Sequence, residues 1–182
     1  MDPAERTRLK DIKHWRMMRP RPELTSSARK DVASIAIELG EDPARVEELV
    51  RDPDHGGAVG RNSLDEARIA LTMERKGRLR EVVRDPRPGC GDLIEQDGAG
   101  QEWDVVSFRG NHFKNANVLR TLQEKLEDQR MDDRRLKVIV NTEYLSADQV
   151  AKIKEIVAGH GWSSVVIYGT SSQQTGGFSH EG

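Results

Sequence analysis

The sequence predicts an α/β (α+β) protein with a central mixed sheet of about four strands, flanked by helices, and an N-terminal layer of three helices. Two observations carry this prediction. Apolar residues recur with helical spacing up to about residue 80, and with the short clusters typical of strands after it. The chain then closes with a strand–helix–strand order that is long enough for a parallel crossover, with helices on both faces of the sheet.

Three helices with clear end signals are expected before residue 80. The first covers about 27–39, and Gly40 is placed to cap it. The second starts at Asp42-Pro43, an acidic N-cap followed by proline at the first helical position. The third is expected to begin at Ser63, which forms a capping-box pattern with Glu66, and to run to about residue 76.

The second half of the chain alternates short strands with amphipathic helices. Leu93 and Ile94 precede Asp97-Gly98, a strong turn signal, and predict a hairpin with a strand over 101–108. The later elements are a helix over about 115–130, a buried strand over 137–141, a helix opened by a capping box at 146–149, and a strand over 164–168.

Composition shifts divide the chain into four parts. Residues 1–25 form a basic arm, 26–80 a helical layer that includes the first core helix, and 81–168 the α/β core. Residues 169–182 are rich in Ser, Gln, Gly and Thr and predict a mobile tail.

Composition also excludes several classes of protein. Charges nearly balance, with 29 Lys+Arg against 31 Asp+Glu, so a strongly polybasic protein is excluded. Cys90 is the single cysteine, which excludes an intramolecular disulfide and a Cys-rich zinc site. No apolar run approaches the roughly 18 residues of a membrane helix, and the start has no apolar signal segment. A cytoplasmic protein without a membrane partner is therefore expected.

Acidic residues around the predicted hairpin are the strongest candidates for chemistry. Asp92 begins its first strand, and Glu102 and Asp104 point to one face of its second strand. Val106 and Phe108 share that face, so an acid there needs a partner. Strand pairing would bring Asp92 near Asp104, and the three carboxylates would form a site for Mg²⁺ (or Mn²⁺). The structural alternative is that Asp92 caps a turn and Glu102 is solvated.

Several short segments carry a resemblance to a known family. They are SLDEA at 63–67, ERKGRL at 74–79, RDP at 84–86, GDLI at 91–94, DG at 97–98 and EWDV at 102–105, followed by KVIVNT at 137–142 and GWSSVVIY at 161–168. Together they resemble the restriction-endonuclease-like toxin domains of bacterial polymorphic toxins, which belong to the PD-(D/E)xK nuclease superfamily. The resemblance implies that Glu66 is a helix acid that helps hold metal, and that Asp92 and Asp104 are the metal acids. It further implies metal-dependent hydrolysis of DNA or RNA.

The family motif requires a lysine two residues after the second acid, where this chain has Val106. That lysine positions or activates the attacking water and stabilises charge in the transition state. Two explanations are open. A cation from a neighbouring element replaces it, and Lys114 is favoured over Arg109 and Lys76, since Arg109 cannot serve as a base. Alternatively, the domain is a catalytically degenerate nuclease fold that binds nucleic acid or protein.

Further cations are candidates for contact with nucleic acid. They are Arg75, Lys76, Arg109 and Lys125, although Lys125 equally fits a surface ion pair. The basic arm adds to them. A toxin-like domain would be delivered as an effector, and the resemblance implies a protein partner such as an immunity protein.

Overall fold

A computed structural model describes residues 3–96, 100–131 and 136–169. Within these ranges five strands form one mixed sheet in the order β1-β2-β3-β4-β5. β1 (Val82–Arg84), β2 (Leu93–Glu95) and β3 (Glu102–Ser107) pair antiparallel, and β4 (Leu136–Asn141) and β5 (Val165–Tyr168) continue parallel to β3. The predicted fold class is confirmed, with five strands rather than about four.

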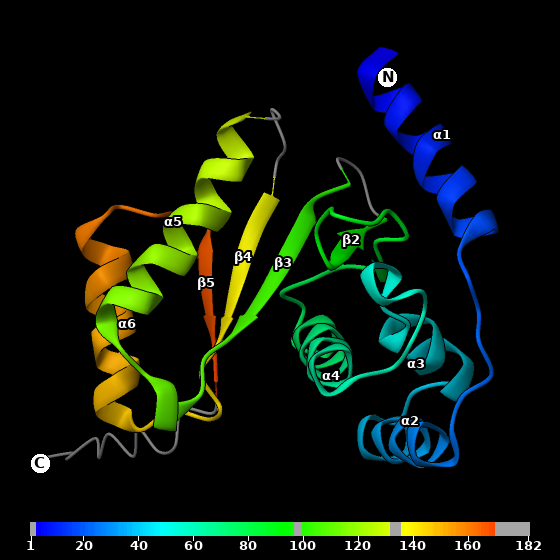
Figure 1. Ribbon diagram of the computed structural model, residues 1–182, viewed down its shortest axis with the longest axis horizontal. Coiled ribbons are helices and arrows are strands. Elements are labelled where there is room, and N and C mark those ends of the chain that lie inside the picture. The colour runs from blue at the N-terminus through cyan, green and yellow to red at the C-terminus, as the bar shows by residue number, and fades with distance from the viewer. Residues whose placement is uncertain (1–2, 97–99, 132–135, 170–182) are drawn as a thin grey trace, which may run out of the picture.

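The helices cover the sheet on both faces (Figure 1). α2 (Ser26–Leu39), α3 (Pro43–Val50) and α4 (Arg61–Arg75) lie on one side, and α5 (Asn115–Met131) and α6 (Ala147–Gly159) lie on the other. Two single-turn 3₁₀ helices, Pro53–His55 and Gly110–His112, join these elements. The layered arrangement follows from the rule that an element with one apolar face must bury it against another element.

Two apolar clusters hold the layers together. The larger joins α2, α3 and α4 to one face of the sheet through Trp103 and Val105. The smaller joins α5 and α6 to the other face, where Val106 packs with Val118 and Leu122. The alternation of Trp103 and Val105 with Val106 is the period of two that a strand imposes. Asp104 therefore belongs to the face that α5 covers.

The expected end signals of α2, α3 and α6 are present. Gly40 adopts a left-handed conformation (φ 63°) after α2, which a residue without a Cβ adopts without strain. Asp42 accepts a hydrogen bond from the N–H of Ala44 at the start of α3. At α6, Ser146 and Gln149 each bond the other's backbone N–H.

The predicted start of α4 was wrong. α4 begins two residues before Ser63, at Arg61, and its N-cap is Gly60. The Ser63 hydroxyl lies in the first turn, where it accepts from the N–H of Gly60 and donates to the same residue's carbonyl. Glu66 consequently lies inside the helix and has no capping role.

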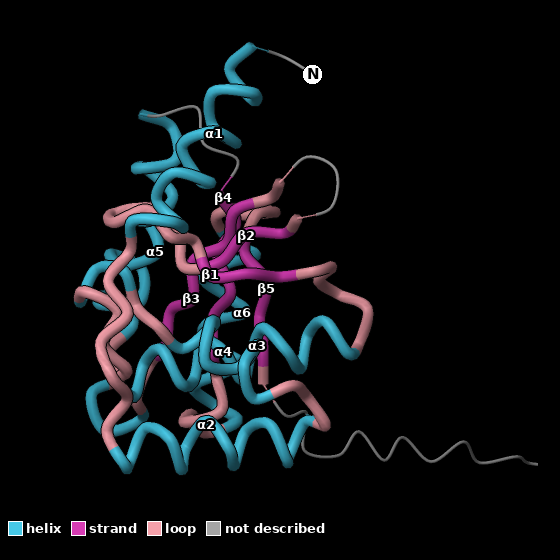
Figure 2. Tube along the Cα trace, turned by 90° about the vertical axis from the view of Figure 1, so that its right-hand side faces the viewer, coloured by secondary structure: helices cyan, strands magenta, loops and turns pink. Residues whose placement is uncertain are grey.

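The N-terminal arm contains a sixteen-residue helix, α1 (Pro3–Met18). Figure 1 shows this helix beside the sheet and apart from its covering helices, and in Figure 2 its N-terminal turns extend beyond the rest of the described chain. Ion pairs of Arg8 with Glu102, and of Arg19 and Arg21 with Glu48, are among the contacts that tie the arm to the body. The predicted turn at Asp97-Gly98 and nearly all of the predicted tail lie outside the described residues. No helix among those described is long and apolar enough to cross a membrane.

Candidate functional site

Three carboxylates approach one another from three elements. The β2–β3 register pairs Leu93 with Trp103, so the next position places Asp92 opposite Asp104. Asp92 is held there because its Oδ2 accepts the N–H of Val105 at 2.7 Å. Glu66 projects from the middle of α4, close enough to act electrostatically on Asp92. The structure thus brings together the three acids that the family resemblance singled out.

A buried arginine from β1 lies between these acids. Arg84 Nη1 lies 2.7 Å from Glu66 Oε2 and 3.8 Å from Asp92 Oδ1. Its Nε donates to the carbonyl of Leu49, near the end of α3, at 2.6 Å. The guanidinium is fixed by these contacts, so it orients Glu66 as well as neutralising charge.

The second cation at the site is Lys125, on α5. Its Nζ forms an ion pair with Oδ2 of Asp104. Val106, at the position of the family lysine, is buried in the apolar cluster under α5 and supplies no polar atom. The structure therefore places an ammonium group against Asp104, and this group comes from the covering helix and not from the strand.

Burial raises the pKa of two of the three acids. The pKa of Asp92 lies well above its usual value, first because the carboxyl is desolvated, and then because Asp104 and Glu66 are close. A side-chain hydrogen bond between Asp92 and Asp104 acts in the same direction on the pKa of Asp92. Desolvation likewise raises the pKa of Glu66, although Arg84 opposes this. Three carboxylates face two cations, Arg84 and Lys125, so the cluster retains an excess of negative charge when all are ionised.

This donor set fits a hard divalent cation. Mg²⁺ is usually bound through one or two carboxylates, with waters and substrate phosphates as its other ligands. Asp92 and Asp104 offer two adjacent carboxylates, and their mutual repulsion is what a cation would relieve. Among the described residues, no group of three or more His, Cys, Asp or Glu side chains could form a metal site by itself. Protein ligands beyond the Asp92–Asp104 pair are not required for Mg²⁺.

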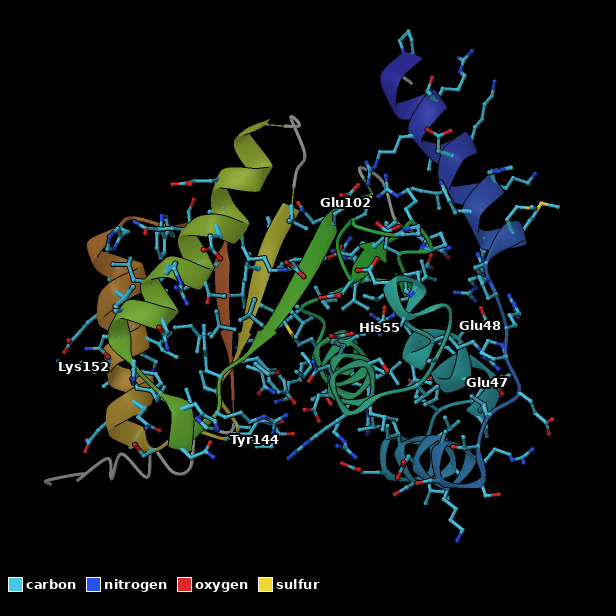
Figure 3. All side chains as sticks on the ribbon, in the orientation of Figure 1. Glu47, Glu48, His55, Glu102, Tyr144 and Lys152 are labelled. Carbon is cyan, nitrogen blue, oxygen red and sulfur yellow. The ribbon has the colours of Figure 1, made fainter. Side chains whose placement is uncertain are left out.

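Glu102, predicted as a further metal ligand, has other partners. Its Oε1 accepts from Arg8 of α1 at 2.9 Å and from Arg87 at 2.7 Å. Arg87 also bonds both oxygens of the fully buried Asp85. Figure 3 shows Glu102 at the end of β3 that lies toward α1. Glu102 stands opposite Ile94, two residues along β3 from Asp104. At that position its side chain pairs with Arg8 and Arg87 instead of joining Asp92 and Asp104.

The remaining predicted site residues lie away from the acids. Lys114 is in the turn before α5, where it lines a pocket beyond the end of β3. Arg109 lines the same pocket, pairs with Asp65 at 3.3 Å and lies over the Tyr144 ring. Arg75 and Lys76 are exposed at the end of α4, nine and ten residues after Glu66, or about 14 Å along the helix.

Arg84 and the pairing of Lys125 with Asp104 were not predicted. No strand was predicted at the position of β1, because only two apolar residues mark it. Lys125 was expected to face substrate or make a surface ion pair. The helical spacing of α5 could have indicated this pairing. Lys125 lies three residues after the buried Leu122, and this spacing places it at the edge of the buried face of the helix.

Comparison with known proteins finds no match. No protein-family model, no curated protein and no solved structure is significantly similar to this chain.

Proposed function

We propose that this protein is a metal-dependent nuclease of the PD-(D/E)xK type, acting on DNA or RNA in the manner of a toxin or effector domain. The observation that carries the proposal is the meeting of Asp92 and Asp104 with Lys125. Two neighbouring carboxylates and an ammonium group are the groups that this hydrolysis requires. The strand and helix order that surrounds them supports the same proposal.

Each residue has a role that its surroundings suggest. Asp92 and Asp104 would hold Mg²⁺ (or Mn²⁺), which when bound polarises the phosphodiester and supplies an activated water. Lys125 would orient that water and stabilise the negative charge that develops on the phosphate. Arg84 keeps Glu66 directed toward the pair, and the main-chain N–H of Val105 fixes the Asp92 carboxylate.

A second candidate function is a catalytically degenerate fold that binds nucleic acid or a protein such as an immunity protein. The buried, apolar Val106 favours it. In this alternative, Lys125 and Arg84 neutralise structural acids and no cation is required. The two candidates differ in whether the acid cluster binds Mg²⁺.

Mg²⁺ binding and phosphodiester cleavage, measured in one buffer, test the proposal. The wild type is compared with Asp92→Asn/Asp104→Asn by titration calorimetry and with labelled DNA and RNA strands. A matched control removes two charges elsewhere, Asp148→Asn/Glu155→Gln, both exposed on α6. We expect the wild type and the control to bind Mg²⁺ and to cleave, and the site variant to do neither.

Two other outcomes are informative. Mg²⁺ binding that survives in the Asp92→Asn/Asp104→Asn variant would show that the cation binds elsewhere and would contradict the proposed site. Absence of both Mg²⁺ binding and cleavage in the wild type would favour the degenerate, binding-only function.

A further inference from the structure

A second feature of the α5 face is a pocket beyond the end of β3. It has a volume of about 310 Å³ and lies between the β3–α5 connection and the first turns of α5. Ligand pockets range from roughly 300 to 1,000 Å³, so this one is the size of a single small unit. Its position gives it access from solvent, because His112, Lys114 and Asn117 on its wall are exposed.

The pocket wall is basic. Arg109, His112, Lys114 and Arg120 line it, and no acid is among its lining residues in the described chain. Arg109 Nη2 pairs with Asp65 behind the wall, whereas its Nη1 is buried and finds no acceptor within the described residues. Its guanidinium also lies over the Tyr144 ring, 3.8 Å from the ring centroid, so Arg109 is held in place and adds positive charge to the pocket wall.

The same wall carries two aromatic rings. Phe108 and Phe113 are half-buried, and both pack against the apolar cluster under α5. A ring fixed on one side and open on the other is a platform on which a planar group can stack. Cations beside aromatic platforms form the combination that binds a nucleotide through its phosphate and its base.

The pocket adjoins the carboxylate site along two elements. Asn117 and Thr121 line it, and Lys125 follows at the same spacing of four, so all three share one edge of α5. Thr121 and Lys125 are one helical turn apart, about 6 Å along the axis. Phe108 follows the last residue of β3 and lies four residues after Asp104, or about 13 Å along the extended chain. One strand of nucleic acid can therefore reach both places.

We infer that this pocket binds the nucleotide next to the phosphate at the Asp92–Asp104 site, and that the substrate is single-stranded there. The inference rests on the proposed nuclease function, and it narrows the substrate from nucleic acid in general to a single strand. His112 and Lys114 contact the phosphate, with Arg109 behind them, and Phe113 stacks on the base. Stacking on a protein ring requires a base that is not stacked in a duplex, which selects a single strand.

The test measures binding without cleavage. A labelled single strand of about ten nucleotides, as DNA and as RNA, and a duplex of the same sequence are titrated in EDTA. The variants are His112→Ala/Lys114→Ala, which removes an exposed histidine and an exposed lysine, and Phe113→Leu, which keeps the apolar packing. The matched control is Lys152→Ala/His160→Ala, an exposed lysine of α6 and the exposed C-cap of that helix, neither of which lines the pocket.

We expect His112→Ala/Lys114→Ala to raise the Kd for the single strand about tenfold and to lower the salt slope by about 0.7, the value for one phosphate contact. Phe113→Leu is expected to raise the same Kd about fivefold and to leave the salt slope unchanged. Binding of the duplex should change less in both variants, and the control should match the wild type.

Three results separate the two proposals. Cleavage by the wild type with Mg²⁺, together with unaltered single-strand binding by both variants, would overturn the pocket and leave the nuclease. The expected losses of binding without any cleavage by the wild type would support the pocket and overturn the nuclease. Equal weakening of single-strand and duplex binding would overturn the single-strand assignment.

Discussion

At the scale of single residues, the ammonium group beside Asp104 comes from a helix and not from the strand. A lysine at position 106 would project from the strand, whereas Lys125 reaches Asp104 from the covering helix. Val106 then extends the apolar contact with α5, which holds that helix against the sheet. An ammonium group can be positioned from either element, since a lysine side chain is long and flexible and carries a compact charge.

Lys125→Met tests this position directly. Methionine keeps the length and apolar character of the stem but removes the charge, so folding should be preserved. Under the proposed function, we expect the cleavage rate to fall by about a hundredfold or more, the typical effect of deleting a group that stabilises transition-state charge. Mg²⁺ binding should persist, because Asp92 and Asp104 remain.

The matched control is Lys152→Met, an exposed lysine on α6. Cleavage by the control at the wild-type rate, measured on the same labelled strand, isolates the role of Lys125. Full activity in Lys125→Met, with an unchanged melting temperature, would show that the ion pair with Asp104 is structural only.

Residue patterns predicted the acidic half of the site better than its basic half. Asp92 and Asp104 could be paired in advance because a hairpin register links them. Lys125 lies 21 residues after Asp104, and Arg84 lies on a strand of only three residues. Their positions depend on how α5 and β1 pack, which the local sequence does not encode.

At the scale of elements, long and well-capped helices were predicted more accurately than short strands. α2, α3 and α6 begin and end within a residue or two of their signals. The exception is α4, where Ser63 fitted a capping box but the N-cap is Gly60, three residues upstream. β1 escaped prediction because pairing with β2, and not its own residues, makes it a strand.

Helix α1 carries a clear excess of positive charge, which leads to a prediction about nucleic-acid binding. It carries five cations, Arg6, Arg8, Lys10, Lys13 and Arg16, against Glu5 and Asp11. Under the proposed function, deleting residues 1–18 should weaken nucleic-acid binding and lower the salt slope by at least about 1, since several phosphate contacts are lost. Fluorescence anisotropy in EDTA over a range of salt concentrations measures both quantities.

The deletion also removes Arg8, a partner of Glu102, so its control must separate charge from packing. Arg29→Ala/Lys30→Ala removes two exposed cations from α2 and leaves α1 intact. An unchanged salt slope in the deletion, or an equal change in the α2 variant, would contradict a specific role for the basic arm.

At the scale of the whole molecule, the acid cluster joins the two layers that cover the sheet. Asp104 belongs to the face under α5, whereas Glu66 comes from α4 on the other side. Arg84 adds a third connection, from β1 to the end of α3. The energetics of this cluster therefore contribute to the stability of the entire fold.

The raised pKa values of Asp92 and Glu66 set the sign of this contribution. Between the ordinary carboxyl pKa and the raised one, the folded state binds more protons than the unfolded state. The free energy of unfolding contributed by these acids therefore falls as pH rises through that window, and it stays low above it. Each unit by which the folded pKa exceeds the unfolded one is worth about 1.4 kcal/mol.

Asp92→Asn should therefore be more stable than the wild type at pH 7.5, and this advantage should shrink as pH falls toward about 4, near the unfolded pKa of the carboxyl. The asparagine oxygen can still accept from the N–H of Val105, so the substitution removes charge and keeps the hydrogen bond. Urea unfolding at several pH values measures the difference, with Asp148→Asn as the control. An advantage that is constant with pH would mean that Asp92 is not protonated in the folded state.

Mg²⁺ should reverse this order. A cation bound by Asp92 and Asp104 stabilises only the folded wild type, by about 2.7 kcal/mol at a hundred times its Kd. At pH 7.5 the wild type should gain stability with added Mg²⁺ and Asp92→Asn should gain little. Near pH 4 the gain should vanish, because a protonated carboxyl is a poor ligand. A gain in stability shared equally by both proteins would place the cation away from Asp92 and argue against the acid cluster as the metal site.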